Sequence, residues 1–442
     1  MQIKLSDHFT YGKILRFTLP SIAMMIFTSI YGMVDGYFVS NFVGKTSFAA
    51  VNFIFPFIMI LSAVGFMFGS GGSALVAKTL GEGDKERANR LFSLVVYASI
   101  VCGAVITVLG ILLIRPIAAL LGAEGQMLEE CVIYGRIILA SMIPFMLQVE
   151  LQSLFITAEK PNLGFLITVV AGVTNIVLDF LLVGVFSFGL VGAALATTLS
   201  QTVGGVVSVI YFLCPNKSIL RLGKTRFEGA ALVKTCTNGF SELLSNISMS
   251  LVGMLYNFQL MKYAGENGVA AYGVLMYVSM IFMAIFIGYS IGSAPPVGFH
   301  YGAENCDELK NLLKKSLTII AATSVCMVVL SLVLAEPLSR IFVGYDPSLF
   351  SLTRRGFNIY AFSFLFSGFA VFGSCFFTAL NNGLVSAIIS FMRTMVFQIS
   401  AVLILPLLLD MDGIWLSVVV SDLLSVVVTA VLLLTQRAKY KY

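Results

Sequence analysis

Four oxygen-bearing side chains interrupt long apolar runs in the first half of this 442-residue chain: Asp35, Asn175, Asp179 and Thr197. Asn175 and Asp179 are four residues apart, which stacks them on one face of a helix. Counted at about 1.5 Å per helical residue from the ends of their runs, all four fall at a similar depth in the outer half of a membrane. An unpaired carboxylate in hydrocarbon is costly, so such acids usually face an interior cavity and mark an ion or proton path.

The chemistry available to this group is cation binding. A pair of carboxylates with amide and hydroxyl oxygens can hold Na⁺, a hard cation that prefers oxygen, and the same carboxylates can load and release protons. The alternative is that these side chains only hydrogen-bond neighbouring helices. We favour the cation function most strongly for Asp35 and Asp179.

Other charged residues also lie inside apolar runs: Arg136, Glu150, Glu242, Arg393 and Asp422. Arg393 and Asp422 are expected at similar depth on adjacent antiparallel helices, which favours a structural ion pair over a transport function. Glu150 and Glu242 are expected near the inner ends of their helices. Glu150 either lines an inward-facing cavity or is a helix-end acid that snorkels to the interface.

The helices that position these residues are expected to form two similar sets, because the sequence contains an internal repeat. Matches between the two halves keep one constant offset, which aligns residue 1 with residue 222 and divides the 442-residue chain equally. Glycine and proline dominate the matches, for example Gly32 with Gly253, Gly81 with Gly302, and Pro116 with Pro337. Most of these positions are interpreted as helix-packing or loop positions. Internal duplication in an apolar chain is typical of secondary transporters.

The polar residues break this repeat. In the same alignment, the four oxygen-bearing residues face others of different chemistry: Asp35 faces Tyr256, Asn175 faces Val396, Asp179 faces Ser400, and Thr197 faces Val418. A residue that serves only the shared fold should recur in both copies, whereas a one-sided functional group need not. The sequence therefore predicts a symmetric fold with a cation site in the N-terminal half alone.

The composition is that of a membrane protein. Hydrophobic residues make up 58% of the chain and charged residues 11%, against about 25% charged in soluble domains; the mean hydropathy is +0.97. Runs of roughly 20 apolar residues can each span a bilayer. They begin near Leu15, Phe48, Ser93, Cys131, Leu163 and Gly189, and then near Cys236, Val269, Ser316, Gly356, Leu384 and Gly413. We therefore expect an all-α polytopic protein with twelve spans, six in each half.

The loops predict the orientation. Lys and Arg concentrate before the first span, between the second and third, and in the central loop, and such enrichment marks the cytoplasmic side. Both termini are then cytoplasmic, and the first span doubles as the targeting signal. Because six is even, the halves are parallel, with a pseudo-twofold axis along the membrane normal. We expect an N-lobe at 1–213, a cytoplasmic linker at 214–235 and a C-lobe at 236–442.

Several functions are excluded by what the chain holds. The seven cysteines are scattered without Cys-x-x-Cys spacing and are interpreted as small apolar fillers. Two histidines, His8 and His300, cannot by themselves build a metal site, so no metal is expected beyond Na⁺ at the cation site. No nucleotide-binding loop or catalytic triad is present, which argues against an enzyme. The net charge of +5 reflects the loop bias and suggests no nucleic acid.

Particular motifs carry a family resemblance. Leu19-Pro20, the run 34–39 (VDGYFV), Ala49-Ala50-Val51 and the run 301–305 (YGAEN), with Asn175-x-x-x-Asp179 and Ala196-Thr197, resemble multidrug and toxic compound extrusion (MATE) transporters. The resemblance covers the whole chain and is greatest to the bacterial branch related to the MepA and DinF exporters. His300 departs from the pattern, since relatives often place Asn there. Some branches use acids of the C-lobe, but Glu242 and Asp422 do not match that pattern.

The resemblance implies an antiporter of the bacterial plasma membrane that needs no cofactor. Na⁺ or H⁺ would re-enter while a small, amphipathic and often cationic compound leaves, with Asp35, Asn175, Asp179 and Thr197 carrying the coupling ion. We expect a monomer in the lipid bilayer.

The chain fits two other transporter classes less well. A flippase for a lipid-linked sugar or cell-wall precursor would need cationic residues in its groove, and only Arg136 and Arg393 lie within the spans. A major-facilitator transporter is disfavoured because residues 81–87 lack the expected second glycine of that class's loop motif.

Overall fold

The computed structural model describes residues 3–442, and the regular structure of these residues is entirely helical. The N-terminal half contains α1 (Tyr11–Phe42), α2 (Lys45–Gly81), α3 (Lys85–Leu120), α4 (Gly125–Ala140), α5 (Met142–Thr157), α6 (Pro161–Leu178), the π-helix η1 (Asp179–Val185) and α7 (Gly189–Leu213). The C-terminal half contains α8 (Gly229–Gly302), α9 (Cys306–Val343), α10 (Pro347–Tyr360), the 3₁₀-helix η2 (Ala361–Ser363), α11 (Phe364–Ala379), α12 (Gly383–Phe391), the π-helix η3 (Met392–Gln398) and α13 (Ile399–Tyr440).

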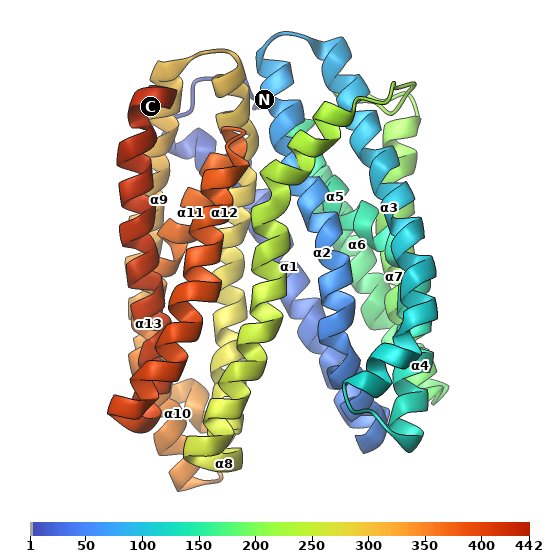
Figure 1. Ribbon diagram of the computed structural model, residues 1–442, viewed down its shortest axis with the longest axis vertical. Helices are drawn as coiled ribbons and strands as arrows, with labels where there is room; N and C mark the ends of the chain where they lie inside the picture. The colour runs from blue at the N-terminus through green and yellow to red at the C-terminus, as the bar shows by residue number, and fades with distance from the viewer. Residues whose placement is uncertain (1–2) are drawn as a thin grey trace.

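The protein is a multi-pass membrane protein. Within residues 3–442, nine helical stretches are long and apolar enough to cross a membrane, or ten if the bent α4–α5 pair is one span. Two of these stretches, of 74 and 58 residues, are far longer than the roughly 20 residues that a bilayer requires. Each contains one residue with non-helical backbone angles, Gly265 in α8 and Asp410 in α13, and α8 runs the length of the molecule and returns (Figure 1). If the bent pair is one span and each of these two stretches crosses twice, the count is the twelve spans expected, although the continuous helical stretches number fewer.

Helix boundaries differ from the expected ones in a consistent direction. Most helices begin several residues before their apolar run; α3, for example, begins at Lys85 rather than near Ser93. The expected fourth span is two helices, α4 and α5, bent by 53°. Residues 229–235, expected to be linker, form the start of α8. Apolar runs indicate only the part of a helix that lies in hydrocarbon, whereas the backbone hydrogen bonds continue into the polar layer.

The helices of the two halves gather on opposite sides of the molecule, and both termini lie at the same end (Figure 1). At that end the halves touch through glycines. A Cβ added to Gly81 would lie 1.9 Å from the Phe299 carbonyl oxygen, and one added to Gly302 would lie 2.0 Å from the Lys78 carbonyl oxygen. Lys78 and Phe299 are themselves aligned by the repeat, so one contact occurs twice about the pseudo-twofold axis.

Toward the opposite end the two halves diverge (Figure 1). Gly32 and Gly253 are another pair aligned by the repeat, and a Cβ added to either of them would meet no atom within 4 Å. The expected helix-packing function therefore holds for Gly81 and Gly302, which join the halves, and not for Gly32 and Gly253. The structure is closed at that end, which we predict to be cytoplasmic.

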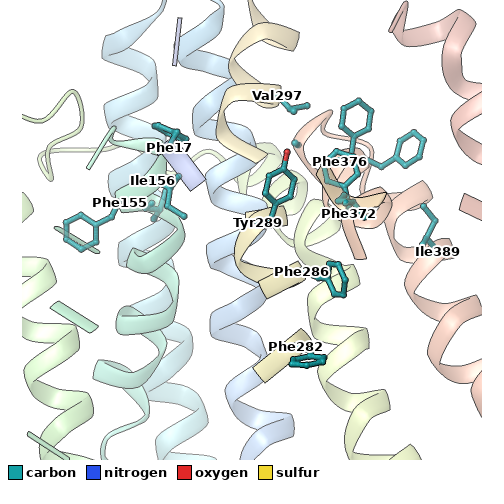
Figure 2. Close-up of a cluster of buried hydrophobic side chains, with 14 of the residues drawn as sticks. Phe17, Phe155, Ile156, Phe282, Phe286, Tyr289, Val297, Phe372, Phe376 and Ile389 are labelled. Carbon is teal, nitrogen blue, oxygen red and sulfur yellow. The ribbon is translucent and has the colours of Figure 1, made fainter. Parts of the chain in front are cut away.

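A large apolar cluster joins the halves. Figure 2 shows part of it, with Phe17 and Phe155 from the N-terminal half and Phe286, Tyr289 and Phe376 from the C-terminal half. Each of these five side chains is at most 3% exposed. Because polar groups are scarce between helices inside a membrane, close packing of such side chains and of glycines holds the helices together.

The segment before α1 binds to both halves. The Leu5 amide donates a hydrogen bond to Glu159 Oε1 at 2.7 Å, and the Phe9 amide donates to Glu308 Oε1 at 2.9 Å. Glu308 Oε2 also lies 2.6 Å from His8 Nδ1. Leu5 and Phe9 are fully buried. This segment therefore crosses the boundary between the halves at the end that carries the termini.

Candidate functional site

The structure brings the four oxygen-bearing residues of the N-terminal half together. Asp35 comes from α1, Asn175 from α6, Asp179 from the first position of η1, and Thr197 from α7. The Thr197 hydroxyl donates to Asp35 Oδ1 at 3.4 Å. The Asp35 carboxylate also faces the side chains of Asp179 and Asn175. Residues separated by up to 162 positions in the chain thus share one site.

Several oxygen atoms of this site are buried and accept no hydrogen bond from the described residues. Asp179 is 0% exposed and Asn175 is 2% exposed. Both carboxylate oxygens of Asp179 and the amide oxygen of Asn175 are buried without a hydrogen-bond donor among the described residues. Buried polar atoms normally have partners, and each exception needs an explanation. Oxygens of this kind are the ligands of Na⁺, and a proton on either carboxylate would equally supply a donor.

The local backbone at Asp179 is unusual. The α-helix α6 ends at Leu178 and continues as the π-helix η1, which begins with Asp179. π-helical turns are rare and often occur at functional sites, because the wider turn re-aims side chains and loosens backbone hydrogen bonds. The break between α6 and η1 lies between Asn175 and Asp179, the pair whose spacing indicated a shared helix face.

The sequence interpretation missed residues that adjoin this group. Tyr31 on α1 lies near Asp35, and the buried Tyr134 on α4 lies near both carboxylates. Tyr134 and Thr197 line a cavity of about 40 Å³ in the N-terminal half, together with Gln201. The three missed residues also break the repeat, since Tyr31 faces Val252, Tyr134 faces Arg355 and Gln201 faces Asp422. Applying the same comparison to neutral polar residues would have found them.

The equivalent place in the C-terminal half is filled by aromatic packing. Tyr256, the counterpart of Asp35, stacks on Tyr272 with ring centroids 5.4 Å apart. Its hydroxyl forms a 2.6 Å hydrogen bond with the Ser417 hydroxyl. Asp179 and Asn175 have Ser400 and Val396 at their counterpart positions. The two halves therefore share a fold but differ at this site.

The two charges deep in the C-terminal half compensate each other. Arg393 Nε donates to Asp422 Oδ1 at 3.0 Å. The Ser367 hydroxyl donates to the other oxygen of Asp422. The Asp422 side chain is 4% exposed and the Arg393 side chain 21% exposed, and both oxygens of Asp422 are paired, as a structural ion pair requires.

The remaining intramembrane acids differ from each other. Glu150 on α5 is 0% exposed, and both of its oxygens lack a partner among the described residues. The interpretation of Glu150 as a snorkelling acid is therefore wrong, because the bent α4–α5 pair places it inside the helix bundle. Glu242 on α8 lines a second cavity of about 40 Å³, between the halves. Neither cavity is lined by a Lys or Arg of the described chain.

No group of three or more His, Cys, Asp or Glu side chains with metal-binding geometry occurs in the part of the chain that the structure describes. Arg136 on α4 is exposed. The basic groove that a flippase for a phosphorylated lipid would need is thus not formed by either intramembrane arginine.

Comparison with known proteins shows which family has this sequence and fold. The sequence profile of the family described as MatE matches residues 20–181 and 243–404, which together make up most of the chain. The chain belongs to the MatE family. One matched segment lies within each copy of the internal repeat, so each copy by itself matches the family's sequence profile.

Relatives of this MatE protein include multidrug exporters. The multidrug export protein MepA of Staphylococcus saprophyticus is 25% identical over 409 residues, which cover 91% of this chain and 87% of MepA. The multidrug export protein MepA of Staphylococcus aureus (strain MRSA252) is 26% identical over 323 residues, covering 72% of this chain and 70% of MepA.

Solved structures show the same fold. A crystal structure of MATE in complex with MaL6 superimposes with a TM-score of 0.93 at 24% identity, covering 98% of both chains. An outward-facing multidrug resistance MATE family transporter of the MOP superfamily also gives 0.93, at 23% identity, covering 98% of this chain and 97% of that one. This MatE protein is accordingly a multi-pass membrane transporter of a multidrug efflux family, and its family's members are transporters rather than enzymes.

Proposed function

We propose that this protein exports small amphipathic, often cationic compounds by antiport, and that Na⁺ or H⁺ entering at Asp35, Asn175, Asp179 and Thr197 drives the export. The observation that carries the proposal is the convergence of these residues from four helical elements, with buried acceptor oxygens that no group of the described residues satisfies. A structural network would be expected to satisfy its own members. A cation site needs acceptors that are free when the cation is absent.

The position of the site can couple cation binding to movement of the two halves. Asp35 lies on α1, which packs against α8 of the other half near the end that carries the termini. Asp179 begins a π-helical turn. Loading one cation halves the negative charge of the carboxylate pair and weakens their mutual repulsion, which changes how α1 and η1 pack. A cation shifts the balance between two conformations only by its difference in affinity for them, so the site must be reshaped when the halves rock.

The test is transport by the purified protein in lipid vesicles. A Na⁺ gradient and a pH gradient are imposed separately, and uptake of the fluorescent cation ethidium is followed. We expect one gradient to drive uptake in the wild-type protein. Asp179→Asn keeps the size of the side chain but removes the charge, and we expect at least a tenfold loss of gradient-driven uptake.

A matched control is Asp410→Asn. Asp410 is an exposed carboxylate of the C-terminal half with a positive φ of 48°, a conformation that Asn also tolerates. We expect this variant to transport at the wild-type rate. Wild-type uptake in Asp179→Asn would contradict the assignment of the coupling site, and failure of both gradients in the wild-type protein would contradict antiport by Na⁺ or H⁺.

A further inference from the structure

A second group of buried polar side chains lies inside the N-terminal half, apart from the Asp35 group. Glu150 on α5 and Ser99 on α3 are both 0% exposed. Both carboxylate oxygens of Glu150 and the hydroxyl of Ser99 are without a hydrogen-bond partner among the described residues. The Ser99 hydroxyl faces the carboxylate, and so does the thiol of Cys102, three residues further along α3. Glu150 is therefore an enclosed acid that faces neutral groups.

Helices of the N-terminal half enclose this acid closely. A Cβ added to Gly69 on α2 would lie 2.9 Å from the Glu150 Cα atom, so this glycine lets α2 come directly against the acid. Among residues 3–442, no Lys, Arg or His forms an ion pair with Glu150. Cys102 is the one other titratable group that faces it from α3, and α2, α4, α6, α7 and α8, which also pack on α5, present no charged group to it within the described chain.

The repeat shows that the fold itself does not require this acid. The constant offset aligns Glu150 with Val371. It aligns Ser99 with Ile320, which is 2% exposed. The C-terminal half thus has apolar side chains at both equivalent positions. The comparison that identified the Asp35 group identifies Glu150 and Ser99 as well, and a pair of polar residues present in one copy alone is expected to have a function of its own.

The ligand that suits this group is a proton. A carboxylate ion enclosed in a membrane protein without a countercharge is costly, and such a group usually becomes neutral instead. A hard metal cation takes about six oxygen ligands, whereas Glu150 and Ser99 together offer three, and Glu150 lines neither of the two cavities described above. A proton needs no further ligand. It neutralises the acid and supplies an O–H donor that the Ser99 oxygen can accept.

Glu150 is near the end of the molecule that carries the termini. It precedes Thr157, the last residue of α5, by seven residues, or about 10 Å. The loop that follows α5 binds the segment before α1. Asp35, in contrast, precedes Phe42, the last residue of α1, by seven residues at the opposite end. The two acids are thus nearest to opposite ends of the molecule.

The first turns of α8, from the other half, cover this group. A Cβ added to Gly71, two residues from Gly69 on α2, would lie 1.9 Å from the Thr235 carbonyl oxygen of α8. Cys236 of α8 packs, together with Cys102, against an apolar cluster of the N-terminal half, and the two thiols are near each other. Parting of the halves at the end that carries the termini therefore removes α8 from the α2 and α3 side of the acid.

We propose that Glu150 is a proton-binding site that takes up one proton when the halves close at the end carrying the termini and releases it to that side when they part. Closure encloses the carboxylate and so requires the proton, whereas parting lets water solvate the charge. The closed form then binds one proton more than the parted form, so a rise in pH favours the parted form by up to about tenfold per pH unit. This site goes beyond the proposed antiport and does not depend on which cation occupies the Asp35 group.

The first experiment asks whether the closed protein holds the proton. Infrared difference spectra of the full-length protein in lipid vesicles at about pH 7 are compared with spectra of Glu150→Gln. An exposed Glu, with a pKa of about 4.3, is ionised at this pH. We expect the wild-type protein to show the C=O band of a protonated carboxylic acid that Glu150→Gln lacks. Absence of that band would overturn the inference.

The second experiment asks whether the proton is released on parting. Spin labels at Glu86→Cys and Asp307→Cys, whose native side chains are 87% and 99% exposed, report the distance between the halves. They are placed in Gly81→Ala, where the added methyl group opposes closure, on a background without the native cysteines. We expect the ratio of parted to closed molecules to rise about tenfold between about pH 6 and about pH 7. Glu150→Gln should remove most of this rise, and Glu150→Asp, which keeps an acid, should retain it.

Asp35→Asn is the matched control, because it removes an acid near the opposite end. The part of the pH response that depends on Glu150 should persist in this variant, so the outcome is independent of the export function. A pH response that is the same with and without Glu150 would overturn the inference and assign a permanently protonated, structural acid. Loss of antiport with an intact Glu150 response would count against the export function alone.

Chemical labelling of the wild-type protein decides the question if Glu150→Gln does not fold. A hydrophobic carbodiimide reacts with the protonated form of a carboxylic acid. At about pH 7, where exposed acids are ionised, it should modify Glu150 and leave Asp422 unmodified, since the Asp422 carboxylate is paired with Arg393. Mass spectrometry locates the modification. A Glu150 side chain that does not react would overturn the inference.

Discussion

The glycine contacts between the halves give a sharp test of how this transporter closes. Gly81 and Gly302 occupy equivalent positions of the repeat, and each sits directly on a carbonyl oxygen of the other half. Gly81→Ala or Gly302→Ala adds one methyl group at the end of the molecule that carries the termini. Neither change alters charge, and Ala favours helix over Gly.

The size of the effect follows from the distances. The new Cβ atoms would lie 1.9 Å and 2.0 Å from the oxygens of Phe299 and Lys78. Unstrained contacts between heavy atoms are about 3.5 Å, so the helices must separate by roughly 1.5 Å at each site. Overpacking of this kind costs about 1–3 kcal/mol. Since the contact is lost when the halves part at this end, each substitution should favour the parted state by about 5- to 150-fold.

Distance measurement between spin labels reads this shift directly. Glu86→Cys and Asp307→Cys place labels at two positions related by the repeat, whose side chains are 87% and 99% exposed. Pulsed electron resonance on a background without the native cysteines should show a longer distance in Gly81→Ala and Gly302→Ala than in the unsubstituted protein. We expect the double variant to show the longer distance almost exclusively.

Gly32→Ala and Gly253→Ala are the matched controls, because an added Cβ meets no atom within 4 Å at either position. Their distance distributions should equal that of the unsubstituted protein. If Gly81→Ala and Gly302→Ala also leave the distribution unchanged, then the two helices do not approach through these glycines, and the reasoning is refuted.

Two further predictions concern stability and the segment before α1. Asp422→Ala leaves the partly buried Arg393 without its carboxylate partner and should lower the free energy of unfolding by up to about 3–5 kcal/mol, the cost of breaking a buried pair. Arg393→Met combined with Asp422→Leu should restore most of the lost stability, as thermal unfolding in detergent would measure. Equal stability of Asp422→Ala and wild type would contradict the ion pair. Glu308→Ala removes the acceptor of the Phe9 amide and of His8 and should make residues 3–9 cleavable by added protease. Cleavage at the wild-type rate would mean that the other contacts of the segment, such as the Leu5 hydrogen bond to Glu159, hold it without Glu308.

Much of the architecture could be predicted from the sequence because its causes are local or periodic. Apolar runs of spanning length predicted the helices, and the constant offset of the repeat predicted two similar halves. The boundaries were less accurate, since polar residues such as Lys85 continue a helix beyond its apolar part. The bend of 53° between α4 and α5 has a local cause in Pro144, which cannot donate a hydrogen bond to the carbonyl of Ala140 at the end of α4. The apolar run continues through this proline, so hydropathy alone predicts one straight span.

Part of the candidate site could also be predicted from the sequence, and part could not. Comparing one half with the other identified Asp35, Asn175, Asp179 and Thr197, because a duplicated chain carries its own control for what the fold requires. The pairing of Arg393 with Asp422 also followed from their depths. Tyr31 and Tyr134 also differ between the halves, but tyrosine is common in membrane-spanning runs, so their place beside the carboxylates became visible only in the fold.

The sequence by itself determined that this is a duplicated membrane protein of twelve expected spans with polar groups confined to one copy, because hydropathy, repeat register and residue type are properties of the chain. Only the tertiary structure decided which polar groups are satisfied. Among the described residues, the carboxylate oxygens of Asp179 and Glu150 have no hydrogen-bond donor, while those of Asp422 have two, and Glu242 lines a cavity between the halves. Hydrogen bonding and burial depend on which helices pack together, and residues from both halves of the chain meet only in the folded protein.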